Sequence, residues 1–371
     1  MVGSATLSEK LLSSFHATLQ LLCSFTPPSN GLSRAYCGKR SSTDSFLNLC
    51  YASSPPKDLF DNFQANSPSN LDVYNKWVKK FKVEPVIEEV PQTGKKVVWI
   101  GSKNAENVVF YVHGGGFMVP ISDFMFTFWL YVQRAYAKRT GGKEISIVSM
   151  EYSLHPQTFP TQLTEIVHAF NHFLSASNVK PSNIHLAGDS AGANLVLQLL
   201  SHTLHPLPSA DVPASPLNNL SEPIRGTLLI SPWCSLNERT STHVENTASD
   251  CLTADSLLYW GSSYLGGVKY SHIPYIKTLA AGERWFDGVD KLTERILITA
   301  GDAECLLEDA IRLHDRLQAS CVEGKPKLEV DVEEDGVHED MMMELGAGGR
   351  SLTPAGEGIV EWLLKGHGVN A

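Results

Sequence analysis

The stretch Gly-Asp-Ser-Ala-Gly at 188–192 has the residue types that covalent catalysis by a hydroxyl group needs. The apolar run 184–187 before it indicates a strand, and a helical pattern begins at Ala193. A serine at such a strand-to-helix turn exposes its Oγ, and flanking glycines let the chain reverse sharply without side-chain clashes. N–H groups at the start of a helix favour a nearby oxyanion. We therefore predict that Ser190 is a nucleophile.

A second glycine-rich stretch, His-Gly-Gly-Gly at 113–116, comes directly after the apolar run 108–112. Glycines leave backbone N–H groups unobstructed, and preorganised N–H donors in a dry site stabilise the oxyanion that forms in acyl transfer. We predict an oxyanion hole formed by the N–H groups of Gly114, Gly115 and Ala191. A plain flexible loop is the alternative, and the position of this stretch upstream of a serine turn argues against it.

A general base for this serine is expected after the last strand of the sheet. His338 follows the apolar run 328–332, which is the last predicted strand. An imidazole there can take the proton of Ser190 and later deliver it to the leaving group. Its place in chain order selects it among 13 histidines, since His185 lies inside a predicted strand and His314 inside a predicted helix.

Two carboxylates, Asp302 and Glu304, follow the preceding predicted strand, 296–300. Either of them could hold the imidazole in the required tautomer. Asp309 lies farther along, within a predicted helix, where we expect a solvated role. The residues alone leave the choice between Asp302 and Glu304 open.

Together these motifs resemble the hormone-sensitive-lipase-like family of α/β-hydrolases over about 83–365 of the chain. The shared features are the loop at 113–116, the turn at 152–160, the serine turn at 188–192, Ser-Pro-Trp at 231–233, and the order serine, acid, histidine. The resemblance implies an α/β-hydrolase fold: a mostly parallel eight-stranded sheet with helices on both faces and an N-terminal helical cap. It also implies hydrolysis of carboxylic esters with short to medium acyl chains and without a cofactor.

The resemblance also bears on the acid and on the surroundings of the base. The family's acid loop usually reads Asp-Pro-Leu-Arg-Asp-Glu, and residues 304–309 align with it after a one-residue insertion, which favours Glu304 over Asp302. The family usually has glycine after the histidine, whereas Glu339 follows His338 here. In this feature the chain is more similar to fungal steryl-acetate-hydrolase-like esterases than to bacterial members.

The predicted elements alternate in a way that suits such a site. Apolar runs separated by amphipathic helices indicate a mostly parallel sheet covered on both faces. We predict an N-terminal cap or lid segment over 1–82 and a catalytic domain over 83–371, with an insertion at 234–290 that contributes to the lid. The runs 97–100 and 108–112 are expected to be antiparallel neighbours. Further strands are predicted at 145–150, 184–187, 227–230, 296–300 and 328–332, and helices near 123–140, 160–177, 191–204, 306–320 and 354–365.

Composition limits the classes of function. The 371 residues carry a net charge of −10 without a basic cluster, so a nucleic-acid partner is not expected. The seven cysteines form no Cys-x-x-Cys pair and no zinc-like spacing with histidine, so no metal site is expected. This cysteine usage favours a reducing compartment, and we expect a cytoplasmic location.

The N-terminal stretch 11–25 shows leucines and phenylalanines at helical spacing, interrupted by polar residues. We expect an amphipathic helix that packs over the main domain, and contact with a membrane surface is the alternative. No apolar span of the length of a transmembrane helix occurs, so none is expected.

Aromatic and apolar residues follow the glycine loop directly, and we expect Phe117, Met118 and Val119 to line a substrate pocket. The predicted partner is therefore a hydrophobic small-molecule ester. An alternative within catalysis is an enzyme of a biosynthetic pathway, in secondary metabolism, that uses the same serine for acyl transfer or a non-hydrolytic step. A ligand receptor of the same fold is a further alternative, against which His338 argues. A homodimer is left open.

Overall fold

The computed structural model describes residues 67–208 and 212–368, and in this part of the chain eight strands form a single sheet. The strands are β1 (Val86–Glu89), β2 (Lys96–Ile100), β3 (Asn107–Val112), β4 (Ile145–Met150), β5 (Ile184–Asp189), β6 (Gly226–Ile230), β7 (Arg295–Gly301) and β8 (Lys327–Glu333). Their order is β1-β2-β4-β3-β5-β6-β7-β8. β1 pairs antiparallel with β2 and β2 with β4, while all other neighbours are parallel. The expected mostly parallel sheet is confirmed.

The prediction that the second and third strands are antiparallel neighbours is wrong. β4 lies between them: Val97 of β2 pairs antiparallel with Met150, and Val112 of β3 pairs parallel with the same Met150. A helical crossover after β3 returns the chain parallel to β3, and β4, whose residues are all buried, takes an inner position in the sheet. The polar turn between β2 and β3 therefore joins strands that a third strand separates.

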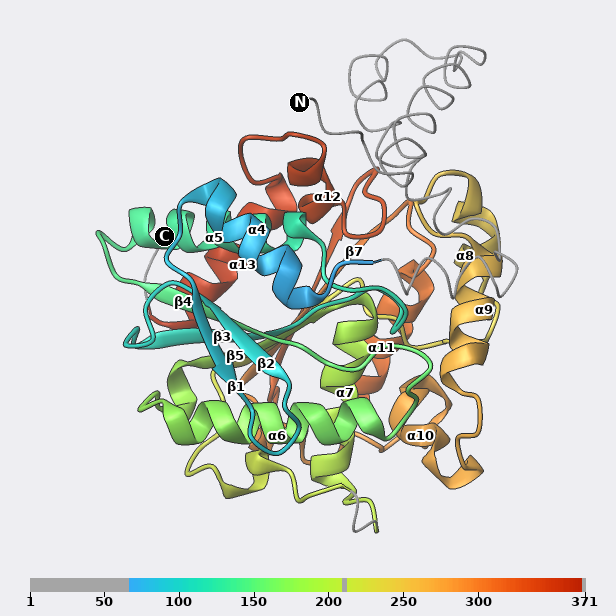
Figure 1. Cartoon of the computed structure of the whole chain (residues 1–371). Coiled ribbons are helices and arrows are strands. Elements are labelled where there is room, and N and C mark those ends of the chain that lie inside the picture. Colours follow the sequence, from blue (N-terminus) through green and yellow to red (C-terminus); the bar gives the residue numbers. More distant parts are fainter. Residues whose placement is uncertain (1–66, 209–211, 369–371) are drawn as a thin grey trace, which may run out of the picture.

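Helices cover both faces of the sheet (Figure 1). They are α4 (Asn70–Phe81), α5 (Asp123–Arg139), α6 (Thr161–Ala176), α7 (Ser190–Leu204), α8 (Ser241–Glu245), α9 (Ala254–Tyr264), α10 (Ile273–Ile276), α11 (Leu307–Ala319), α12 (Asp340–Gly346) and α13 (Pro354–Gly366). Short 3-10 helices are η1 (Pro181–Asn183), η2 (Pro216–Asn219), η3 (Asn246–Ala248), η4 (Tyr270–His272), η5 (Thr278–Ala280) and η6 (Val289–Lys291). The five long helices predicted within the catalytic domain all form.

Two hydrophobic clusters hold the layers together. One contains side chains of α6, α7 and α11, and the other contains side chains of α4, α5, α12 and α13. Successive residues of a strand point to opposite faces of a sheet. In β2, Val97 and Trp99 belong to the first cluster, and Val98 and Ile100 belong to the second. The clusters therefore lie on opposite faces, which explains why these strands lack polar alternation.

Two segments outside the sheet pack onto this core. The predicted insertion at 234–290 contains α8, α9 and α10, which Figure 1 shows together on one side of the molecule. Helix α4 buries Trp77, whose Nε1 donates a hydrogen bond of 3.1 Å to Thr127 Oγ1 of α5. Residues 1–66, with the helix predicted at 11–25, lie outside the described residues. The cap boundary and the lid role stay predictions.

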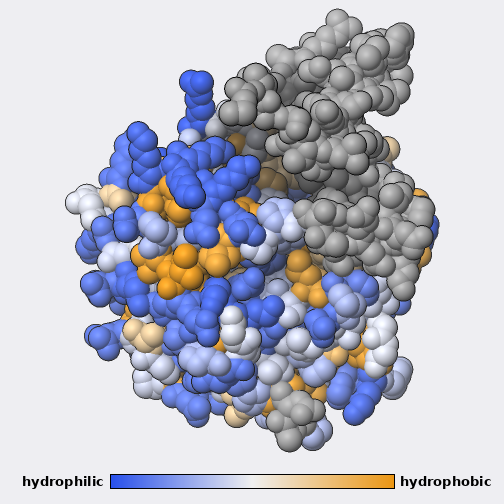
Figure 2. All heavy atoms as spheres, in the orientation of Figure 1, coloured by the Kyte–Doolittle hydropathy of each residue, from blue (hydrophilic) through white to orange (hydrophobic). Residues whose placement is uncertain are grey.

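The surface is predominantly hydrophilic on the face drawn in Figure 2, where hydrophobic side chains gather in separate patches. Within the described ranges, none of the helices combines the length and the apolar character that crossing a membrane requires.

Candidate active site

Four of the predicted site segments follow strands whose carboxyl ends lie at one edge of the sheet. The glycine loop at 113–116 follows β3, Ser190 follows β5, Glu304 lies after β7 and His338 lies after β8. These strands are parallel to one another within the run β3-β5-β6-β7-β8. Carboxyl ends of parallel strands form the usual ligand-binding edge of an α/β sheet. The topology therefore gathers segments that are far apart in sequence.

The turn at Ser190 has the strained backbone that the glycine spacing predicts. Ser190 is the first residue of α7 and has a φ of +50°, which is unusual for a residue with a side chain. A Cβ on Gly188 would lie 2.6 Å from the backbone of Gly192, and a Cβ on Gly192 would lie 2.1 Å from the carbonyl oxygen of Val112. Both glycines are therefore needed for close backbone approach, and Gly192 brings the start of α7 against the end of β3.

The glycine loop lies directly against this turn. A Cβ on Gly114 would lie 2.1 Å from Asp189 Oδ2 and 3.0 Å from the Asp189 carbonyl oxygen. Gly115 and Gly116 have φ values of +103° and +63°, in the region that glycine tolerates best. The backbone of the glycine loop thus lies next to the backbone at the start of α7. This proximity suits the predicted oxyanion hole of Gly114, Gly115 and Ala191, which stays a prediction.

Tyr152 and His113 hold the glycine loop in place, and sequence reasoning gave neither of them this role. The Tyr152 hydroxyl donates hydrogen bonds to the carbonyl oxygens of His113 (2.8 Å) and Gly114 (3.2 Å), and its ring stacks on the imidazole with centroids 4.3 Å apart. Burial lowers the pKa of His113 to about 4, so the ring is neutral near pH 7. In that state Nδ1–H donates to Gly114 O and Nε2 accepts from Asn70. A tyrosine two residues after the end of a buried strand was the available signal.

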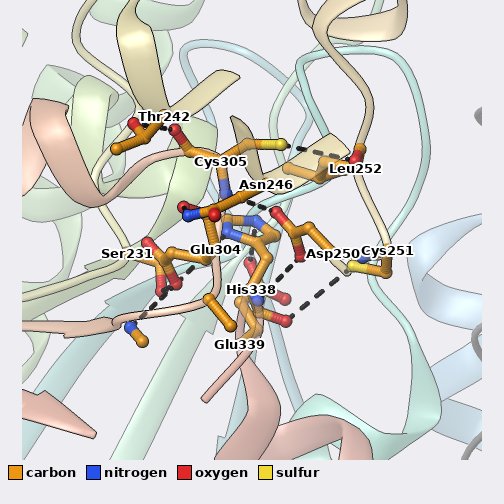
Figure 3. Close-up of polar contacts among 12 residues, drawn as sticks. Ser231, Thr242, Asn246, Asp250, Cys251, Leu252, Glu304, Cys305, His338 and Glu339 are labelled. Carbon is orange, nitrogen blue, oxygen red and sulfur yellow. Dashed lines mark hydrogen bonds and ion pairs between the residues drawn. The ribbon is translucent and has the colours of Figure 1, made fainter. Parts of the chain in front are cut away.

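The base and one of the two acid candidates meet in the interior (Figure 3). His338 Nδ1 lies 4.0 Å from Glu304 Oε2, and both side chains are almost fully buried. Glu304 Oε2 also accepts hydrogen bonds from Ser231 Oγ (2.7 Å) and from the Gly301 N–H (3.1 Å). Burial raises the pKa of Glu304 to about 7, against the opposing effect of His338. Asp302 is exposed instead. The geometry favours Glu304 as the acid.

Asp309 does not have the solvated role that its helical position predicts. The side chain is fully buried, and Oδ2 accepts hydrogen bonds from the N–H groups of Cys234 (2.7 Å) and Ser235 (2.8 Å) and from Ser235 Oγ (2.8 Å). Burial raises its pKa to about 6. The segment after β6 folds over the start of α11, and a helix pattern cannot reveal such a contact. Asp309 is a structural residue beside the site.

A pair of buried carboxyl groups borders the glycine loop. Glu339 Oε1 lies 3.4 Å from His338 Nε2, and it would lie 2.9 Å from a Cβ on Gly114. Asp189 also lies beside Gly114 and accepts a hydrogen bond from the Tyr111 hydroxyl. Burial raises the pKa of Glu339, and burial together with Glu339 raises the pKa of Asp189 well above its usual range. Both shifts are in the direction of the neutral form, which avoids the repulsion that a carboxylate would exert on a nearby oxyanion.

The three residues predicted to line a pocket are buried in the hydrophobic cluster beside α7. Phe117 stacks on Tyr264 of α9 with ring centroids 3.8 Å apart, and Met118 and Val119 are almost fully buried. The contact joins the glycine loop to the 234–290 insertion. The pocket itself stays a prediction. Within residues 67–208 and 212–368, no cluster of histidine, cysteine, aspartate or glutamate suits a metal ion.

Comparisons with known proteins agree with this architecture. A family model described as alpha/beta hydrolase fold matches residues 109–341. A protein described as probable carboxylesterase 6, from Arabidopsis thaliana, is 30% identical over 181 residues, which are 46% of this chain and 49% of that protein. An esterase from Acinetobacter venetianus is 27% identical over 234 residues, 61% of this chain and 66% of that protein. The chain thus spans about half of the length of the first relative and about two thirds of the second.

Solved structures give the same fold. The crystal structure of an esterase from the bacterial hormone-sensitive lipase family superposes with a TM-score of 0.61 and covers 88% of this chain and 96% of its own. The two sequences are 21% identical, so the likeness is one of fold.

Proposed function

Because this chain belongs to the α/β-hydrolase-fold family, whose model matches residues 109–341, we propose that it is a carboxylic-ester hydrolase with Ser190 as its nucleophile. The observation that carries the proposal is the convergence at one sheet edge of a serine with positive φ, a glycine loop pressed against it, and a buried histidine–glutamate pair. The descriptions of the relatives as carboxylesterase and esterase support the same reaction class.

The proposed reaction has two halves. Ser190 Oγ attacks the ester carbonyl carbon while His338 Nε2 takes its proton, and the N–H groups of Gly114, Gly115 and Ala191 bind the oxyanion. The bond between the carbonyl carbon and the ester oxygen then breaks, and the alcohol leaves with the proton from His338, which forms the acyl-enzyme. In the second half His338 takes a proton from water, and the water oxygen attacks the carbonyl carbon of the acyl-enzyme. The carboxylic acid product is released as His338 returns the proton to Ser190 Oγ.

In the proposed mechanism Glu304 is the acid that supports His338, and the Ser231 hydroxyl holds Glu304. An ionised carboxylate near His338 Nδ1 stabilises the imidazolium that forms in each half and fixes the tautomer with Nε2 facing the serine. The hydrogen bond from Ser231 Oγ holds the carboxylate in the orientation that faces the ring. Apart from the ester and water, every step uses side chains and backbone groups of this chain, and the proposal includes no cofactor.

The proposed substrate is a hydrophobic small-molecule ester. Apolar residues, among them Phe117, Met118 and Val119, follow the glycine loop, and Trp260 of α9 would lie 2.7 Å from a Cβ on Gly116. Aromatic and aliphatic walls beside the reacting carbonyl favour an apolar acyl or alcohol group. The loop carries no fixed positive charge for an anionic ligand.

Turnover of p-nitrophenyl acetate and p-nitrophenyl butyrate tests the proposal. We expect the chain to hydrolyse both, and Ser190→Ala to lower kcat by about 10⁴-fold or more, as loss of a serine nucleophile does in other hydrolases. Ser175→Ala, which removes a hydroxyl that only bonds within α6, is the control and should keep wild-type turnover. Equal turnover by wild type and Ser190→Ala would disprove the assignment.

A further inference from the structure

A short segment of the 234–290 insertion lies between the turn that carries Glu304 and the turn that carries His338 (Figure 3). Asn246 Nδ2 donates to the carbonyl oxygen of Glu304 (2.8 Å), and Cys305 Sγ contacts the carbonyl oxygen of Leu252 at 3.4 Å. The insertion therefore contacts the acid turn at several points, and not only through apolar packing.

Asp250 bonds both turns, which are also joined directly by a hydrogen bond of 2.9 Å from the Ala303 N–H to the Gly336 carbonyl oxygen. Its Oδ2 accepts a hydrogen bond of 2.7 Å from the N–H of Cys305, the residue after Glu304. Its Oδ1 accepts a hydrogen bond of 2.9 Å from the N–H of His338 itself, and one of 2.7 Å from Cys251. The side chain is 2% exposed. One buried carboxylate thus ties the backbone of the base to the backbone next to the acid.

These bonds act where the sheet gives the least support. The two turns extend beyond β7 and β8, and β8 is an edge strand, so the spacing of His338 and Glu304 depends on contacts outside the sheet ladder. Hydrogen bonds to an ionised carboxylate are about twice as strong as neutral ones. Displacement of a reacting group by about 1 Å can cost a factor of about 100 in rate.

We propose that Asp250 is a positioning residue, which sets the separation of His338 and Glu304 by binding the backbone of both turns and so makes the 234–290 insertion part of the catalytic apparatus. The effect on rate rests on the proposed function, whereas the backbone contact does not. Asn at this position keeps the shape and one acceptor but cannot accept from both turns. Asp250→Asn is therefore the informative change.

The chain offers a matched control in Asp309. It is also a fully buried carboxylate that accepts hydrogen bonds from two backbone N–H groups, those of Cys234 and Ser235. It bonds neither the acid turn nor the base turn through these contacts. Asp309 accepts these bonds through Oδ2 alone, so Asp309→Asn replaces a buried carboxyl by an amide that can keep them. An effect of that replacement in itself should appear in both variants, whereas a loss of positioning should affect Asp250→Asn alone.

The experiment measures two properties of wild type, Asp250→Asn and Asp309→Asn. Hydrogen–deuterium exchange should become faster in Asp250→Asn for peptides that cover Cys305 and His338, and should be unchanged there in Asp309→Asn. With p-nitrophenyl butyrate, Asp250→Asn should lose about 10- to 100-fold in kcat with KM within about threefold, and Asp309→Asn should keep kcat within about threefold.

Unchanged exchange at both turns in Asp250→Asn would overturn the proposal, as would equal losses of kcat in the two variants. Should wild type fail to hydrolyse the ester, the proposed function fails, and the exchange measurement still decides whether Asp250 joins the two turns.

Discussion

At the residue scale, the charge state of Glu304 governs the proposed site. A carboxyl with a pKa raised by burial keeps its proton to a higher pH than a free one, so its ionised form is lost as pH falls through about 7. Only the ionised form can stabilise the imidazolium of His338. We therefore expect the protonation of Glu304 to limit activity at acid pH.

We predict that kcat/KM for p-nitrophenyl butyrate decreases as pH falls below about 7, and that Glu304→Gln lowers kcat by about 10²- to 10⁴-fold at pH 8. Asp302→Asn is the control, because Asp302 is exposed, and it should stay within about threefold of wild type. The measurement is a pH–rate profile of all three proteins. A larger loss in Asp302→Asn than in Glu304→Gln would move the acid to Asp302.

Glu339 gives a second prediction at this scale. Its neutral form suits an oxyanion at the glycine loop, and its ionised form opposes one. Glu339→Gln keeps the shape without the charge, so we expect activity within about tenfold of wild type, under about 1.4 kcal/mol. The measurement is kcat and KM of wild type and Glu339→Gln with p-nitrophenyl butyrate. A loss of much more than about tenfold in Glu339→Gln would show that the site needs the carboxyl group itself.

Sequence reasoning could propose some of these residues and could not propose others. Ser190 and His338 could be selected because their chemistry depends on position in strand order. Asp250 and Asp309 act on the site or its surroundings through hydrogen bonds with backbone groups of distant segments, and such bonds leave no local residue pattern. Sequence reasoning noted Glu339 only because the family that the chain resembles usually has glycine at this position.

At the element scale, the strand-to-helix turn between β5 and α7 depends on close backbone contact with the end of β3. Sequence reasoning placed the sheet and its long helices because apolar runs and helical spacing are local signals. It misplaced the partner of β2, because pairing is decided by which strand takes the inner position, and it missed β1 and α12, which are short.

We predict that Gly192→Ala destabilises the fold by about 1–3 kcal/mol, because its Cβ would lie 2.1 Å from Val112 O and 2.5 Å from His113 O, and neither backbone atom can move freely. The displaced glycine loop should also lower kcat. Gly282→Ala is the control, since a Cβ there meets nothing within 4 Å. Urea denaturation and ester turnover measure both effects. Wild-type stability in Gly192→Ala would refute the close contact.

At the scale of the whole molecule, the end of the sheet opposite the candidate site holds two neighbouring histidines, of which His185 is buried and His367 is half-buried. His185 at the start of β5 and His367 after α13 have ring centroids 4.9 Å apart and pack against Trp362 and Arg295. Burial lowers the pKa of His185 well below its usual range and that of His367 to about 4. Acid pH therefore acts on the fold as well as on the site.

The sign of this effect follows from proton binding. Below pH 6.5 the unfolded chain protonates these histidines and the folded chain does not, so their contribution to stability is lost as pH falls from about 6.5 towards 4. We predict that His185→Phe reduces this loss by up to about 1.4 kcal/mol per pH unit relative to wild type. Urea denaturation at several pH values between 4.5 and 7 measures the difference. A parallel pH dependence in both proteins would show that His185 does not contribute.

The most direct test of the proposed nucleophile is covalent labelling with a fluorophosphonate, followed by peptide mapping by mass spectrometry. A serine activated by a base displaces fluoride and keeps the phosphonyl group. The account predicts one adduct per chain, on Ser190, and strongly reduced labelling in His338→Ala. An unlabelled Ser190 in the folded wild-type protein, or an adduct at another residue that persists in Ser190→Ala, would contradict it.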